Sequence, residues 1–181
     1  MLNPPMDPEV FPYKRMRGVI EKYTSGLSLR YQLSIEPNQK LVAHDSDIWW
    51  DARWGLKLVQ SNGLTHSVVA FECLEKVLQV KQLQEMKFRG DSREHCSGFR
   101  WERLLLAAVC VLAQYTLGCK EVRVLKAEFT PWYNDLPNHA DRSIEEYQAG
   151  LKRRYDGTAR ALKFKKCPKM NEWVLPVNQA V

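Results

Sequence analysis

The sequence predicts a single α/β domain with a mixed, mostly antiparallel sheet and a buried central helix. Several short segments alternate apolar and polar residues, which is typical of strands with one buried face. The run 104–113 is apolar on every side, which is typical of a buried helix. Gly118 and a strand pattern follow this helix directly, and this order indicates an α/β crossover.

The length and composition favour one folded domain. The chain has 181 residues, of which 45% are hydrophobic and 27% charged, and this excludes a largely disordered protein. Residues 1–12 contain four prolines, so we expect an extended tail over 1–14 and the domain over 15–181. The longest apolar run is shorter than the roughly 20 residues that span a bilayer, which predicts no membrane partner.

The N-terminus and the cysteines predict a cytoplasmic protein. The first residues lack the basic and apolar regions of a signal peptide. The five cysteines are an odd number and contain no Cys-x-x-Cys pair, which favours a reducing compartment.

The first half of the chain predicts antiparallel strands. Alternation over 29–35 indicates a strand, followed by a turn at 36–38 and a short return strand at 41–43. Asn62-Gly63 joins the apolar runs 56–60 and 64–71, which is the strongest short-range hairpin signal.

Two segments in this half leave alternatives open. Residues 76–83 alternate and fit a third antiparallel strand, whereas a helix beginning near Cys73 is the other interpretation. Trp49, Trp50 and Trp54 fit one side of a short helix capped by Asp47, and they would belong to the core or to the floor of a pocket.

The second half predicts helices and closing strands. A helix over 100–117 leads through Gly118 to a strand over 121–125, and loops are expected at 86–98 and 129–141. Ser143 and Glu146 form a capping box that begins a helix running toward Arg154, with a continuation to residue 162 past Gly157. Phe164 and residues 173–175 fit closing strands.

The positive charge is concentrated in one segment. The net charge is +6, from 27 basic and 21 acidic residues, and residues 142–169 alone hold nine basic and three acidic residues. This asymmetry indicates either a solvated face or a surface that binds an anion.

The helix, glycine and strand resemble a known family. Arg103-Leu-Leu-Leu-Ala-Ala-Val through Leu117-Gly-Cys-Lys-Glu-Val-Arg-Val-Leu is similar to the central helix and following strand of the GNAT acyl-CoA N-acyltransferase superfamily. The segment 155–164 resembles the family's helix that ends in Leu-Gly-Phe, with Lys163 in place of the glycine. The resemblance covers roughly residues 55–175 and implies a GNAT-like fold.

The resemblance also implies an activity. The protein would transfer an acetyl or other acyl group from coenzyme A to a small-molecule or protein amine. In the family the catalytic groups lie where two parallel strands diverge beneath the long helix. In this chain Glu85 or Glu128 would be the general base, and Tyr155 or Tyr133 the general acid.

The cofactor site follows from the same resemblance. The family binds the pyrophosphate on a glycine-rich loop before the long helix, at a helix N-terminus that favours anions. The implied acetyl-CoA site includes the end of the strand at Leu83. The guanidinium groups of arginine residues would supply positive charge for the phosphates. Its residues are Leu83, Arg89, Ser97, Gly98, Phe99 and Arg100, with Arg93 as a further cation.

The sequence gives weaker support for a cysteine nucleophile, a metal site or a binding function. Cys96 beside Arg93 and His95 has no third group to orient it as a nucleophile. The four histidines show no metal-binding spacing, so we expect no metal. The alternative function is a catalytically silent GNAT-like module that binds nucleic acid weakly, or an acidic partner, through the basic segment 142–169.

Overall fold

The structure is a computed structural model that describes residues 13–24, 31–37, 50, 52–85, 99–135 and 143–179. Its strands are β1 (Tyr31–Pro37), β2 (Trp54–Gln60), β3 (Thr65–Leu74), β4 (Val77–Glu85), β5 (Glu121–Leu125), β6 (Lys165–Lys166) and β7 (Glu172–Pro176). Its α-helices are α1 (Tyr13–Thr24), α2 (Trp101–Tyr115), α3 (Ile144–Lys152) and the short α4 (Thr158–Ala161). A π-helical turn, η5 (Arg153–Gly157), joins α3 to α4, and 3-10 turns form η4 (Ala127–Phe129) and η6 (Val177–Gln179).

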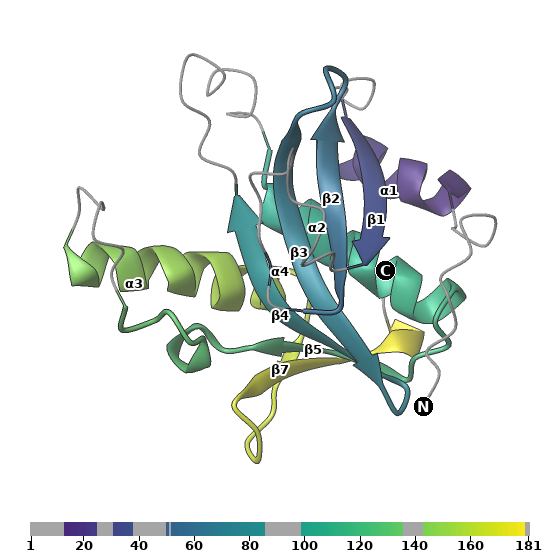
Figure 1. Cartoon of the computed structure of the whole chain (residues 1–181). Coiled ribbons are helices and arrows are strands. Elements are labelled where there is room, and N and C mark those ends of the chain that lie inside the picture. Colours follow the sequence, from purple (N-terminus) through teal and green to yellow (C-terminus); the bar gives the residue numbers. More distant parts are fainter. Residues whose placement is uncertain are drawn as a thin grey trace.

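The strands form one seven-stranded mixed sheet in the order β1-β2-β3-β4-β5-β7-β6 (Figure 1). Only β4 and β5 run parallel among the described strands, and every other neighbouring pair is antiparallel. The predicted α/β class and the mostly antiparallel sheet are therefore confirmed. The Asn62-Gly63 hairpin joins β2 to β3 as predicted, and the segment 76–83 is the strand β4, so the helix alternative near Cys73 is wrong.

Strand β1 continues where the sequence predicts a turn. Glu36 and Pro37 pair with Gly55 and Trp54 of β2, so the turn expected at 36–38 is wrong for these two residues. The ion pair of 2.6 Å between Glu36 and Lys57 stabilises this extension. Pro37 is the last residue of β1, which is an edge strand of the described sheet, and sheets tolerate proline at such positions. The return strand expected at 41–43 lies outside the described residues.

Helix α2 is the central buried element, as predicted. Every residue from Leu104 to Ala113 is buried, and the helix crosses one face of the sheet (Figure 1). Leu56, Phe71, Leu78 and Val122 are among the fully buried strand residues in the same core. A helix that is apolar all round fits this position between the sheet and a second helical layer.

Helix α1 supplies that layer and was not predicted. Its buried residues Met16, Val19 and Ile20 recur at helical spacing, but charged residues separate them and obscure the pattern. The helix packs against α2, and the Arg15 guanidinium lies 3.5 Å from the centre of the Tyr115 ring. The predicted tail over 1–14 thus includes the first two residues of α1, and residues 1–12 lie outside the described part.

The opposite face of the sheet carries a small apolar cluster of Trp50, Ala52, Val68 and Ala70. Trp54 is the first residue of β2, so the short helix expected around the tryptophans is wrong at that position. Strand pairing with β1 and β3 outweighs the local spacing. Trp50 belongs to this cluster, as the core interpretation predicted, while Trp49 lies outside the described residues.

The capping box of α3 is present as predicted. The Glu146 amide donates to the Ser143 hydroxyl, and the Glu146 carboxylate accepts from the Ser143 amide. The predicted continuation past Gly157 occurs through η5 into α4. Residues 173–175 belong to β7, as predicted, but the strand expected at Phe164 is wrong at that residue, because its amide caps α4 and β6 begins at Lys165.

Lys163 ends α4 in the conformation that glycine favours. Its φ is +64°, and the Phe164 amide donates to the Ala159 carbonyl while the Lys163 amide donates to the Arg160 carbonyl. These two bonds form a Schellman motif, whose left-handed position is usually glycine. The GNAT family has glycine at the position that Lys163 occupies in the resemblance.

We expect Lys163→Gly to stabilise the protein by about 1 kcal/mol, because glycine adopts a positive φ without the strain of a side chain. Urea unfolding followed by circular dichroism measures the change. Gly63→Ala, which places a side chain at a φ of +85°, is the matched control and should destabilise. A loss of stability in Lys163→Gly would contradict the assignment of strain to this residue.

Candidate functional site

The parallel strands β4 and β5 pair over only part of their length. Their register runs from Val77 opposite Glu121 to Val80 opposite Val124, and β4 then continues to Glu85 without this partner. Figure 1 shows the two strands diverging beyond the paired region, with α3 on the side where they diverge; we call this divergence of the two backbones the β4–β5 opening. Backbone groups of β4 in this opening need partners other than β5.

The turn η5 supplies one of these partners. The Leu83 amide donates to the Tyr155 hydroxyl at 2.9 Å, across 72 positions of sequence. Tyr155 is fully buried, and burial raises the pKa of its hydroxyl well above the ordinary value of tyrosine. The hydroxyl therefore stays protonated at neutral pH, and within the described part of the chain no hydrogen bond uses its proton. The predicted residues Tyr155 and Leu83 thus lie together.

The next residue of η5 contacts the other side of the opening. The Asp156 carboxylate accepts from the Ala127 amide at 3.1 Å and from the Trp173 indole at 2.8 Å. Successive side chains of one π-helical turn therefore hold β4 on one side and the segment after β5 on the other. A π-turn places consecutive side chains differently from an α-helix and is frequent at functional sites.

Arg154 also points into the opening, and sequence reasoning missed this role. Its guanidinium lies 3.5 Å from the Leu83 carbonyl, 3.9 Å from the Glu85 carboxylate and 5.3 Å from the Trp101 ring centre. In the sequence it is one of many basic residues in 142–169 and carries no distinguishing signal. The Arg154 side chain points toward β4 because Arg154 lies in the π-helical turn η5.

Glu85 lies at the end of β4 beside a buried histidine. Its carboxylate is 4.0 Å from His66 Nε2, and His66 Nδ1 shares a hydrogen bond of 3.0 Å with the Ser67 hydroxyl. Burial lowers the pKa of His66, opposed by the nearby charge of Glu102. The Glu85 side chain lies 3.9 Å from Arg154. It is 43% exposed, so it is also open to solvent.

The N-terminus of α2 borders the same region. Arg100 precedes the helix, makes no side-chain cap and pairs with Glu102 at 3.3 Å. Phe99 packs against Tyr31, with ring centres 5.1 Å apart, and belongs to an aromatic cluster with His66 and Trp101. Phe99 therefore contributes apolar packing, while Arg100 is exposed enough to contact an anion.

Glu128 and Tyr133 take no part in the hydrogen bonds and ion pairs that join Tyr155, Leu83, Arg154 and Glu85. Glu128 is exposed on η4, and its charge contributes to the raised pKa of Lys152. A hydrogen bond with Tyr133 is the largest cause of that raised pKa, and the Lys152 ammonium lies 5.8 Å from the Tyr133 ring centre. Of the predicted catalytic residues, Glu85 and Tyr155 are thus joined through Arg154 and Leu83, whereas Glu128 is not. Arg89, Arg93, Cys96, Ser97 and Gly98 lie outside the described residues.

The basic segment divides between two roles. Arg154 turns inward, while Lys152, Arg153, Lys165 and Lys166 are exposed. Arg160 lies 5.9 Å from the Trp173 ring centre. Arg142 lies outside the described residues.

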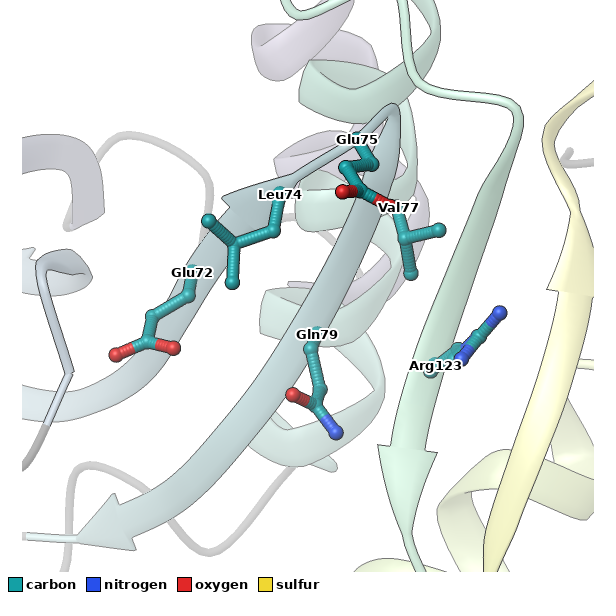
Figure 2. Close-up of a pocket in the computed structure, with 6 residues that line it drawn as sticks. All are labelled: Glu72, Leu74, Glu75, Val77, Gln79 and Arg123. Carbon is teal, nitrogen blue, oxygen red and sulfur yellow. The ribbon is translucent and has the colours of Figure 1, made fainter. Parts of the chain in front are cut away.

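A separate hollow lies on the face of the sheet away from α2 (Figure 2). It has a volume of about 270 Å³ and is lined by Glu72, Leu74, Glu75, Val77, Gln79 and Arg123. Two of its polar lining residues bind groups outside the lining: Arg123 bonds to Glu121 and lies 3.8 Å from Glu172, and Glu172 also accepts from Gln79. The hollow adjoins the paired end of β4 and β5, and so is distinct from the opening near Tyr155.

Comparison with models of known protein families and with curated protein sequences gives no match. Among the described residues no three or more His, Cys, Asp and Glu side chains gather as metal ligands would. No helix of the described part has the length and apolar character to cross a bilayer.

Proposed function

We propose that the protein is an acyl-CoA-dependent N-acyltransferase with its reaction centre in the opening between β4 and β5. The observation that carries the proposal is the Tyr155 hydroxyl, which accepts from the Leu83 amide where β4 has left β5. This arrangement agrees with the GNAT resemblance, in which acid and base lie where two parallel strands diverge. The positive φ of Lys163, at the family's glycine position, also supports it.

Tyr155 is suited to stabilise a departing thiolate by donating a hydrogen bond to it. The Leu83 amide occupies an acceptor lone pair of the hydroxyl and so leaves its proton to point elsewhere. Because burial raises the pKa of Tyr155 far above that of a thiol, which is about 8.5, full transfer of the proton to the sulfur is uphill. Tyr155 would therefore act mainly as a hydrogen-bond donor that stabilises the sulfur's negative charge as the carbon–sulfur bond breaks.

Glu85 is the stronger candidate for the base that takes a proton from the amine. It is partly exposed, lies at the end of β4, and is connected to Leu83 through Arg154. The Arg154 guanidinium lies 3.9 Å from its carboxylate. Glu128 lacks this connection.

We place the phosphates of the cofactor at the N-terminus of α2. Acetyl-CoA would supply the acyl group as an activated thioester. The first turn of α2 has no side-chain cap, so its amides are suited to bind phosphate, and Arg100 would add charge. Glu102 in the same turn is a competing negative charge that Arg100 partly neutralises.

We expect acetyl-CoA to raise the melting temperature by about 5–10 °C at 100 times its dissociation constant. Arg100→Ala should reduce this shift, because it removes a charge-assisted contact to phosphate. Tyr155→Phe should retain the shift relative to its own baseline but slow the release of coenzyme A in the presence of amines, measured by chromatography. Without acetyl-CoA, the free energy of unfolding of this variant should be lower than that of the parent by about 1–3 kcal/mol, because the buried Leu83 amide loses its acceptor.

The absence of any shift with acetyl-CoA would overturn the proposal. The alternative, a silent module that binds nucleic acid or an acidic partner, rests on the exposed basic residues between Lys152 and Lys169. Oligonucleotide binding that weakens steeply with salt, without an acetyl-CoA shift, would favour this alternative.

A further inference from the structure

Two cysteine thiols face each other across the paired end of β4. Cys73 Sγ of β3 and Cys119 Sγ, in the connection from α2 to β5, are 3.2 Å apart and separated by 46 positions of sequence. Cys73 pairs with Leu78 of β4, and Leu78 pairs in turn with Val122 of β5. The two sulfurs therefore meet on the side of β4 that faces the core.

The strand geometry explains why Cys73 points this way. Its neighbours Glu72 and Leu74 line the hollow of Figure 2, and successive side chains of a strand point to opposite faces. Cys73 thus faces the α2 side, where it packs against the main core, but it remains partly exposed at the end of the strand.

Backbone bonds independent of the sulfurs hold Cys119 in place. Its amide donates to the Ala113 carbonyl at 2.8 Å, and the next amide, of Lys120, donates to the Lys76 carbonyl at 2.6 Å. Gly118, with a φ of +58°, permits the sharp exit from α2 that these bonds require. Only a small movement separates the two sulfurs from the S–S distance of a disulfide, about 2.05 Å.

We propose that Cys73 and Cys119 form a reversible disulfide by exchange with a low-molecular-weight disulfide such as oxidised glutathione. The Cys73 thiolate attacks one sulfur of that disulfide, forms a mixed disulfide and releases one small thiolate. Cys119 loses its proton to solvent and attacks the Cys73 sulfur, which expels the second small thiolate. Two protein thiols are oxidised and one small disulfide is reduced to two thiols, so the electrons balance.

The assignment of the attacking sulfur follows from the pair itself. The hydrogen bond from the Cys119 thiol lowers the pKa of Cys73 to about 7, while the same bond raises the pKa of Cys119. Cys110 differs, since full burial raises its pKa to about 12 and it has no sulfur partner among the described residues. The thiolate is the reactive form, so Cys73 reacts first.

The bond would join β3 to the entrance of β5 across β4. It would lie at the paired end of the parallel strands, opposite the end where they diverge. By closing a long loop it would raise the melting temperature by about 5–15 °C.

The test uses the full chain with the Cys110→Ala substitution, because Cys110 and Cys119 share one tryptic peptide, 104–120. After incubation with oxidised glutathione near neutral pH, the intact mass should fall by two hydrogens. Peptide 58–76 should be joined to peptide 104–120, and the melting temperature should rise. Reduction with dithiothreitol should reverse all three changes.

Two further variants test the order of the steps. Cys119→Ser should accumulate glutathione on Cys73, because the second thiol is missing, and Cys73→Ser should yield no cross-link. Cys167→Ser, which removes another partly exposed thiol, is the matched control and should cross-link as well as the parent. Stable glutathionylation of Cys73 in the parent protein without a cross-link, or no reaction at Cys73, would overturn the proposal.

Discussion

Leu105→Ala should lower the free energy of unfolding by about 2–5 kcal/mol. Leu105 is fully buried in the middle of α2, within the main core. Truncation removes apolar contacts and leaves a cavity that the rigid sheet cannot fill. Urea unfolding followed by circular dichroism measures the loss.

Leu64→Ala is the matched control for this experiment. Leu64 is 48% exposed in the turn between β2 and β3, so its truncation should change stability by no more than about 0.5 kcal/mol. A similarly small effect for Leu105→Ala would contradict the central position of α2.

Gly55→Ala should destabilise the protein by about 1–3 kcal/mol. A Cβ atom at this position would lie 2.7 Å from Trp50 Cε2 and 2.8 Å from Trp50 Cζ2, closer than carbon atoms can pack. Trp50 is buried against the face of the sheet opposite α2, so its ring has little room to move. Thermal and urea unfolding measure the effect.

Gly18→Ala provides a control of opposite sign. Gly18 is exposed in α1, and a Cβ atom there would meet nothing within 4 Å. Alanine should therefore stabilise the helix by about 0.5–1 kcal/mol. Equal effects of the two glycine substitutions would show that the contact with Trp50 does not limit position 55.

Local signals in the sequence determined much of the fold. The apolar run of α2, the Asn62-Gly63 hairpin and the Ser143–Glu146 capping box each depend on residues a few positions apart, and the structure has all three. The failures occurred where contacts between distant segments outweigh local preference. Trp54 is drawn into β2 by pairing with Pro37 and Phe71, and α1 is defined by its packing on α2.

The candidate site shows the same division. The sequence indicated Tyr155, Leu83 and Glu85 through a family resemblance, but the inward turn of Arg154 depends on the π-helical turn and on the end of β4. The sequence by itself therefore determined the α/β class, the central helix and most of the strands. Only the tertiary structure decided which side chains meet at the β4–β5 opening and that Cys73 lies against Cys119, because both depend on strand order. Hydrophobic periodicity and capping depend on residues that are close together in the sequence. The Cys73–Cys119 and Leu83–Tyr155 contacts instead join residues 46 and 72 positions apart.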